Sequence, residues 1–128
     1  MGMETLTKAE EKIMQIIWDM KSGFVKDVID KLGEPAPPYN TISSLIRILE
    51  KKGFVGHRAY GKTHEYFPLI SKLSYRSFTF RNFVANYFDG ASGNVLSFML
   101  EEENISPEEI EKAVAEINKN RTDDSAIE

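Results

Sequence analysis

Residues 39–53 of this 128-residue chain read YNTISSLIRILEKKG and have the pattern of an amphipathic helix. Its apolar stripe recurs at helical spacing and consists of Ile42, Leu45, Ile46 and Leu49. The opposite face holds no acidic residue before Glu50; it consists of Asn40, Ser43, Ser44, Arg47 and Lys51, with Thr41 beside them. Two lysines followed by Gly53 are typical of a helix end. The stretch therefore predicts a helix that buries one face and offers small hydrogen-bonding side chains and cations on the other.

Two more helices are expected before this stretch. Thr7 and Glu10 have the spacing of a capping box, and the apolar stripe that follows predicts a helix over about residues 7–20. A second, shorter stripe over residues 25–32 ends at Gly33, which is a suitable C-terminal cap. Prolines at positions 35, 37 and 38 then break the chain, because proline cannot continue a helix but can open the next one.

A β-hairpin is expected after the stretch. The apolar period changes to two over residues 54–60 and 63–67, on either side of the turn Gly61-Lys62. This register would place Arg58 opposite Glu65 and His57 opposite Tyr66. Three helices followed by a two-stranded hairpin is the order of a winged helix-turn-helix, in which the third helix enters the major groove of DNA and the hairpin flanks it.

The residue types on the third helix and the hairpin favour DNA as the ligand. Asparagine can pair with adenine and arginine with guanine, whereas hydroxyls and lysines contact phosphates. We therefore predict as DNA-binding residues Asn40, Thr41, Ser43, Ser44, Arg47, Lys51, Arg58, Tyr60 and Lys62. The alternative is an ordinary solvated helix face beside an exposed hairpin, and the matching alternative function is a winged-helix module that binds protein without reading DNA. His57 and His64 are expected to be strand surface residues.

The second half of the chain has a different composition. Residues 1–70 carry 10 Lys+Arg against 9 Asp+Glu, whereas residues 71–128 carry 6 against 11. A helix over residues 71–88 would hold six of the 14 aromatic residues, and a short apolar helix over about 95–100 follows. A last helix is predicted from Ser106 as its N-cap, Pro107 in its first position and Glu109 three residues after the cap. The chain is thus expected to be mainly α, with a winged-helix DNA-binding domain over 1–70, a helical dimerisation domain over 71–120 and a disordered tail over 121–128.

Dimerisation is expected because the helix over residues 71–88 is apolar around much of its circumference. The two short helices that follow it have too little surface to cover it. A second copy of the chain would supply the missing cover. The predicted dimerisation residues are Phe80, Phe83, Val84, Tyr87, Leu96, Ile110, Val114 and Ile117. The alternative is a self-contained C-terminal core.

Composition excludes several classes of protein. There is no cysteine, so disulfides, thiol nucleophiles and cysteine-ligated zinc are ruled out, and two histidines are too few for a metal cage. No nucleophile motif or pair of carboxylates accompanies the histidines, so neither an enzyme nor a cofactor is expected. No apolar stretch approaches the roughly 20 residues of a membrane span, and the N-terminus does not resemble a signal peptide. We expect a cytoplasmic protein.

Five segments together resemble the penicillinase repressor family of transcriptional regulators. They are LTKAEE at 6–11, IIW at 16–18, YNTI at 39–42, RILEKKGF at 47–54 and YGKTHEY at 60–66. The resemblance runs from about Leu6 to Ile117. It implies a homodimer that binds palindromic operators through its winged helices and is held together by its C-terminal helices. It also implies that Asn40, Thr41, Ser43, Ser44 and Arg47 lie on the face that reads bases and phosphates.

The resemblance carries an expectation about regulation as well. In the family's resistance systems a membrane-bound sensor protease responds to β-lactam, and the repressor is then cut in its dimerisation domain. The family pattern is an Asn-Phe bond, and the matching position here reads Ser97-Phe98, with Asn94 three residues upstream. Copper-responsive relatives use C-terminal cysteines, which this chain lacks.

Overall fold

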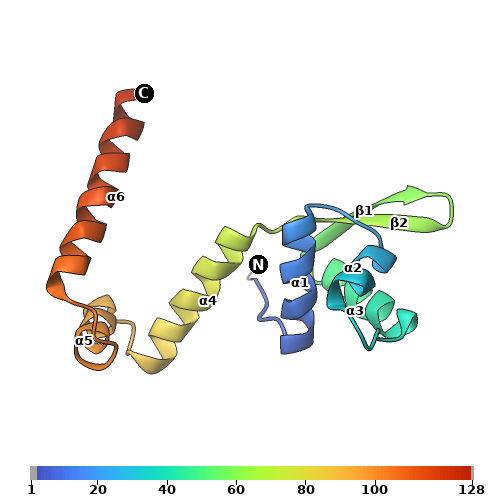
Figure 1. Cartoon of the computed structure of the whole chain (residues 1–128), viewed down its shortest axis with the longest axis horizontal. Coiled ribbons are helices and arrows are strands. Elements are labelled where there is room, and N and C mark those ends of the chain that lie inside the picture. Colours follow the sequence, from blue (N-terminus) through green and yellow to red (C-terminus); the bar gives the residue numbers. More distant parts are fainter. Residues whose placement is uncertain (1–2, 128) are drawn as a thin grey trace. The chain divides into compact units, whose positions relative to one another are not determined.

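The structure is a computed structural model that describes residues 3–127, with side chains described for residues 3–121. It divides into two compact units, one ending at Phe80 and the other beginning at Arg81, which we call the N-terminal and C-terminal units. Six helices and two strands make up the described residues, so the chain is mainly α as predicted (Figure 1). No helix in the described part of the chain is both long and apolar enough to cross a bilayer.

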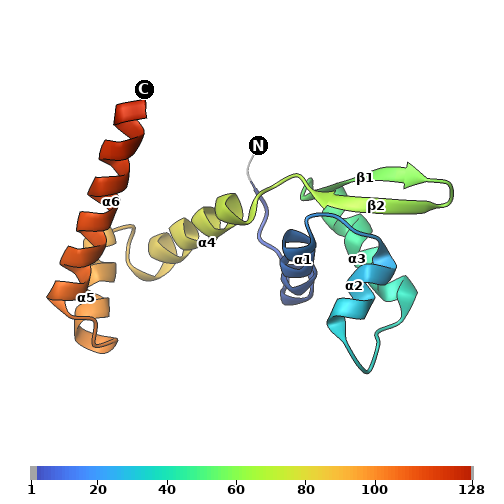
Figure 2. The same cartoon turned by 45° about the horizontal axis from the view of Figure 1, so that its top comes forward.

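The N-terminal unit has the predicted order of three helices and a hairpin. The elements are α1 (Lys8–Met20), α2 (Val25–Leu32), α3 (Tyr39–Lys51), β1 (Val55–Tyr60) and β2 (Thr63–Pro68). The strands pair antiparallel with Arg58 opposite Glu65 and His57 opposite Tyr66, which confirms the predicted register. In Figures 1 and 2 the hairpin extends past the three helices. Pro68 is the last residue of β2 and lies opposite Val55, so the strand is one residue longer than expected.

One apolar core holds these elements together. Its fully buried side chains come from α1, α2, α3 and the start of β1; the largest are Phe54, Ile13, Met14, Ile17, Ile46, Leu49, Val28 and Val55. Burying a side chain of this kind contributes about 1.5 to 3 kcal/mol, so the core outweighs any surface contact of the unit. The predicted stripe of α3 is the buried one, although Leu45 is only half-buried. The orientation of α3 is therefore set by its apolar face.

Helix ends follow the expected chemistry. The Thr7 hydroxyl accepts from the Glu10 backbone N–H, and the Glu10 carboxylate accepts from the Thr7 N–H, which confirms the capping box at the start of α1. Gly33 follows α2 with φ of 81°, and Gly53 follows α3 with φ of 85°, both in the left-handed region that disfavours other residues. Gly53 thus allows the chain to turn from α3 into the hairpin.

The remaining helices are α4 (Lys72–Tyr87), α5 (Ser92–Glu102) and α6 (Pro107–Ile127). The short helix expected over about residues 95–100 begins already at Ser92, because Gly90 supplies the positive φ that the preceding turn needs. Ser106 caps α6 by accepting from the Glu109 N–H. The helix runs on to Ile127, past residue 120, where the helical domain was expected to end. The disordered tail that we predict over residues 121–128 stays a prediction, because side chains are described only as far as residue 121.

The division between the units falls inside α4 and not at residue 70. The first two turns of α4 belong to the N-terminal unit, because Tyr75 is a member of its buried core and Phe78 packs against that core. Sequence periodicity could not show this, since the aromatic residues of α4 are spread around the helix.

Candidate nucleic-acid interface

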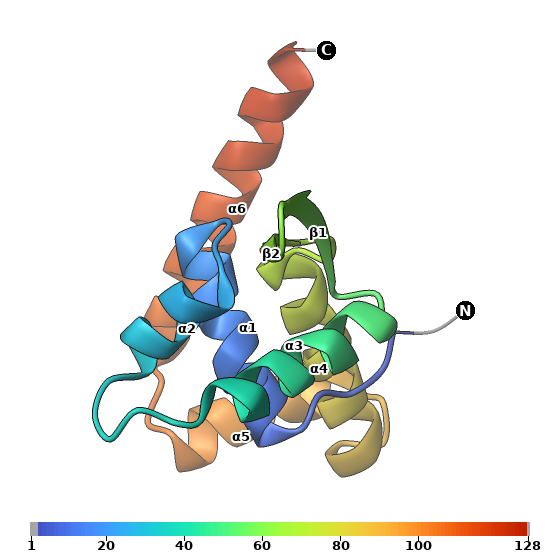
Figure 3. The ribbon, with the colours of Figure 1, turned by 90° about the vertical axis from the view of Figure 1, so that its right-hand side faces the viewer.

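The polar face of α3 is open to solvent along its length. Its exposed members are Asn40, Thr41, Ser44, Arg47 and Lys51, which leave small polar groups and two cations on one surface. In Figure 3 this helix lies at the front of the N-terminal unit, facing the viewer. No acidic side chain stands on this surface, because Glu50 lies at the flank and is half-buried. The surface can approach a polyanion closely.

Ser43 does not belong to that exposed face. It retains only 7% of its surface, because an advance of 100° per residue puts position 43 at the edge of the stripe formed by Ile42 and Ile46. Together with Tyr39 and Arg47 it faces the hairpin and the start of α2. The predicted DNA-binding role of Ser43 therefore shifts from the front of α3 to its side.

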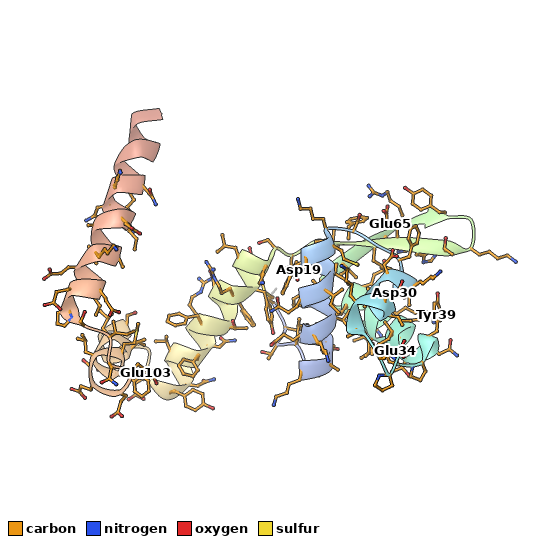
Figure 4. The ribbon with its side chains drawn as sticks, in the orientation of Figure 1. Asp19, Asp30, Glu34, Tyr39, Glu65 and Glu103 are labelled. Atoms are coloured by element: carbon orange, nitrogen blue, oxygen red, sulfur yellow. The ribbon has the colours of Figure 1, made fainter. Side chains whose placement is uncertain are left out.

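A hollow of about 340 Å³ lies between α3, the start of α2 and the hairpin. Its lining is Phe24, Val25, Lys26, Tyr39, Ser43, Arg47, Lys62, Thr63, His64 and Tyr66. Figure 4 labels Tyr39 at the start of α3. The hairpin, on which Glu65 is labelled, lies above it in this view. Three cations and no carboxylate line the hollow, and phosphate oxygens are the groups that such a lining suits. Sequence reasoning missed Lys26 and Tyr39, whose proximity to Lys62 arises only from the fold.

The hairpin holds its predicted residues in different ways. Arg58 donates to the Glu65 carboxylate at 3.1 Å and lies 5.1 Å from the centre of the Phe67 ring, so part of its guanidinium is held within the hairpin. Tyr60 remains 55% exposed, with its ring 6.0 Å from that of Phe24. Lys62 sits exposed at the tip beside Gly61, whose φ is 61°. Of the three, Lys62 is placed best to contact a ligand.

The two histidines connect the hairpin to α3. His57 Nδ1 is hydrogen-bonded to the Glu50 carboxylate, and the His57 ring stacks on that of His64 with centroids 4.1 Å apart. Burial raises the pKa of the neighbouring Tyr66 hydroxyl, and the Glu50 charge raises it further, so Tyr66 stays neutral. Among the described residues no three His, Cys, Asp or Glu side chains are placed to hold a metal ion. The pair is thus a structural link, and both rings lie on the strand surface as predicted.

The family model described as penicillinase repressor matches residues 6–119. The chain belongs to the penicillinase repressor family. This is a family of transcriptional repressors and not of enzymes. The chain is 28% identical over 117 residues to the methicillin resistance regulatory protein MecI of Mammaliicoccus sciuri, covering 89% of this chain and 94% of MecI. It is also 28% identical over 119 residues to the penicillinase repressor of Bacillus licheniformis, covering 91% of this chain and 93% of that protein.

A solved structure supports the fold of the N-terminal unit in this member of the family. The solution structure of the DNA-binding domain of the repressor BlaI matches with a TM-score of 0.51 and 28% identity, covering 58% of this chain and 92% of that one. The winged helix-turn-helix predicted from the order of elements is therefore confirmed.

The C-terminal unit of the chain keeps much apolar surface uncovered. Tyr87 is 74% exposed, and about half of the surface is exposed at Phe83, Leu96, Val114 and Ile117, as it is at Phe80, the last residue of the N-terminal unit. Ile110 is half-buried, and Val84 is buried, so Val84 serves the unit's own core instead of an outer surface. Ring contacts of Phe83 with Phe88, and of Phe88 with Phe98, connect α4 to α5.

Ser97 and Phe98 lie inside α5. The Ser97 hydroxyl donates to the Gly93 carbonyl at 3.1 Å, and the Phe98 ring lies 5.8 Å from that of Phe88. A protease that binds an extended substrate would therefore have to unwind α5 before it could cut here.

Proposed function

We propose that this chain is a sequence-specific repressor that binds palindromic operators as a homodimer. The observation that carries the proposal is the exposed face of α3, where Asn40 and Arg47 stand among small hydroxyl side chains with no acidic neighbour on the same surface. An α-helix fits the major groove, where asparagine and arginine distinguish adenine and guanine by bidentate hydrogen bonds. The family to which the chain belongs supports this reading.

The hollow beside α3 and the hairpin tip would contact the phosphate backbone, which is the same for every DNA sequence. Lys26, Arg47 and Lys62 line the hollow, so a strand of DNA that runs past it would place phosphates against three cations. Such contacts fix the register of the helix on the duplex, whereas the base edges choose the sequence.

The second part of the proposal is that the C-terminal unit pairs two chains. Its exposed apolar side chains occur on α4, α5 and α6, and a second copy of the chain is the cover that we propose for them. We call the N-terminal unit the reading head. When two reading heads are linked in a dimer, binding of the first raises the effective concentration of the second at its half-site, so two weak half-sites become one tight operator. The acidic residues of this half, concentrated at 101–103 and 108–111, would keep it off the duplex.

The third part concerns the signal. MecI is named for methicillin resistance and the Bacillus relative for penicillinase, so a regulon of the β-lactam-resistance type is the natural candidate. Release would follow cleavage at Ser97-Phe98, set off indirectly by a membrane-bound sensor protease, while the repressor itself stays in the cytoplasm and does not enter the membrane. Here Ser97 stands where the family has asparagine, and a chain that stops at Ser97 tests this part of the proposal.

Gel-shift titration of the DNA upstream of the chain's own gene and its neighbours tests the proposal. We expect one or a few fragments with a two-fold symmetric sequence to be retarded, with binding lost at high salt. A fragment with the symmetric sequence scrambled is the control, and the Arg47→Ala variant should lose the preference between the two. Equal retardation of every fragment by parent and variant would mean that the winged helix binds DNA without reading sequence, and no retardation of any fragment would favour a protein-binding module.

A further inference from the structure

Tyr75, in the second turn of α4, bonds to parts of the N-terminal unit that are far away in sequence. Its hydroxyl oxygen accepts a buried hydrogen bond from the Leu6 N–H at 2.8 Å, and only 5% of the residue is exposed. Leu6 precedes α1, so this bond closes a span of 69 residues. A tyrosine hydroxyl that satisfies a buried backbone amide is costly to remove, because the amide is then left without a partner.

The Tyr75 ring reaches two further elements of the same unit. It meets the Phe54 ring edge-on with centroids 5.5 Å apart, and the Trp18 ring at 6.1 Å. Phe54 is fully buried and follows α3 after Lys52 and Gly53, and its N–H donates to the Leu49 carbonyl within α3. Tyr75 thus touches a residue that is hydrogen-bonded to the last turns of the proposed reading helix.

The segment before α4 is fastened to the same place. Trp18 Nε1 donates to the Ile70 carbonyl at 2.9 Å, and the Leu69 N–H donates to the Phe54 carbonyl at 2.7 Å. Ser71 then caps α4 by accepting from the Ser74 N–H at 3.0 Å. The segment that joins β2 to α4 is therefore held by hydrogen bonds to Trp18 and Phe54, and the first turns of α4 are part of the N-terminal unit.

We propose that Tyr75 is a positioning residue for operator binding: it sets the direction in which α4 leaves the reading head, and thereby the spacing and phase of the two half-sites that a dimer can occupy. The proposal rests on the dimeric function above. Because α4 continues as one helix to Tyr87, a small rotation at its first turns would displace whatever its far end is joined to. Tyr75 lies on the face of α4 turned to the core and not toward the DNA-binding face, so it acts through the angle of α4 alone.

The test uses the full chain and the operator found by gel shift, in three versions. The first has the natural spacing, the second has about 5 bp inserted between half-sites so that one half-site turns to the opposite face of the duplex, and the third is a single half-site. For the parent we expect the insertion to cost roughly 100-fold in affinity, since the gain from linking two sites is lost. Tyr75→Leu keeps an apolar side chain in the core but loses the hydroxyl and the ring contacts. It should bind the single half-site like the parent, while the penalty for the insertion falls to about tenfold or less.

Two matched variants complete the experiment. Tyr75→Phe keeps the ring contacts and should restore most of the spacing penalty, whereas Leu73→Ala, on the exposed side of the same turn, should leave it unchanged. Tyr75→Leu with the parent's spacing penalty would overturn the proposal. A parent that shows no spacing penalty would instead refute the linked dimer.

Hydrogen exchange of the free protein tests the role of Tyr75 independently of DNA binding. In Tyr75→Leu the amides of residues 75–80 should exchange faster while those of α1 and α3 keep their protection. Unchanged protection in residues 75–80 would overturn the proposal. A loss of protection throughout the N-terminal unit would overturn it too, because Tyr75 would then stabilise the whole unit and not the direction of α4.

Discussion

The Lys52 ammonium lies 2.8 Å from the Glu10 carboxylate, which joins the first turn of α1 to the residue that directly follows α3. Glu10 is almost fully buried and also accepts from the Thr7 N–H, so its carboxylate is both a helix cap and half of an ion pair. A buried charge is tolerated only when it is paired and hydrogen-bonded in this way. The pair thus fixes the end of the reading helix against the helix behind it.

The first prediction is a loss of stability in acid that depends on Glu10. Burial alone would raise the pKa of the Glu10 carboxyl, but hydrogen bonds from Lys52 and Thr7 and the Lys52 charge outweigh it and hold the pKa below its ordinary value of 4.5. A carboxyl with a lowered pKa in the folded state stabilises the fold above its ordinary pKa, and this contribution disappears as the pH falls through the lowered value. Urea unfolding at pH 7 and at steps down to pH 3 should therefore show Glu10→Gln less stable than the parent at pH 7, with the difference shrinking below pH 4.5.

The matched change on the other side is Lys52→Met. It removes the charge that compensates Glu10, and we expect it to cost about 3 kcal/mol in the free energy of unfolding at pH 7. The double variant Glu10→Gln, Lys52→Met should recover part of that loss, because no uncompensated charge is then buried. Strictly additive losses would show that the two side chains do not interact.

The second prediction concerns sequence reading by α3. Arg47→Ala should weaken operator binding by about 1 to 3 kcal/mol and relax the preference at one base pair, and Asn40→Ala should relax it at a different position. The measurement is a titration against operators with single base-pair changes. Because Ser43 is buried at the side of α3, Ser43→Ala should change the preference at no position. If Arg47→Ala discriminates between bases as the parent does, α3 is not the reading helix.

The third prediction concerns contacts to phosphates. Lys62→Ala at the hairpin tip and Lys26→Ala at the start of α2 should each weaken binding to all DNA sequences nearly equally. Each should also reduce the slope of log K against log salt by about 1, since one fewer counterion is released. Lys119→Ala, in the C-terminal unit, is the charge-matched control and should leave the slope alone. An unchanged slope for Lys26→Ala would exclude the hollow beside α3 as a phosphate site.

The fourth prediction tests the dimer and its regulation. A chain that stops at Ser97 loses the second half of α5 and all of α6, including Ile110, Val114 and Ile117. Apolar surface is worth about 25 cal/mol per Å², so this loss removes several kcal/mol from association. Sedimentation should show the truncated chain as a monomer at concentrations where the full chain is a dimer, and it should release the operator while its circular dichroism retains the signal of folded heads. A truncated chain that stays dimeric and holds the operator would remove the rationale for cleavage at Ser97-Phe98.

Local chemistry made much of this molecule predictable. The helical period of Ile42, Ile46 and Leu49 forecasts which face of α3 is buried, because a single apolar stripe has only one way to leave water. The Thr7 and Glu10 capping box, the ends at Gly33 and Gly53, and the hairpin around Gly61 depend on neighbours a few residues apart, so they could be read without coordinates. Lys62 at an exposed hairpin tip follows from the same local reasoning.

Other features depend on residues that only the fold brings together. Lys26 and Lys62 share one hollow, Glu10 pairs with Lys52 across 42 positions, and Tyr75 accepts from Leu6 across 69, and no periodicity in a single sequence encodes such partners. Ser43 is of a residue type that can contact DNA, yet the packing of α3 buries it on the side that faces the hairpin. The sequence by itself determined the elements and the faces that they bury, because those are set by contacts within a few turns. The tertiary structure alone decided which polar groups meet and where α4 joins the N-terminal unit, because those depend on how the buried faces fit against one another.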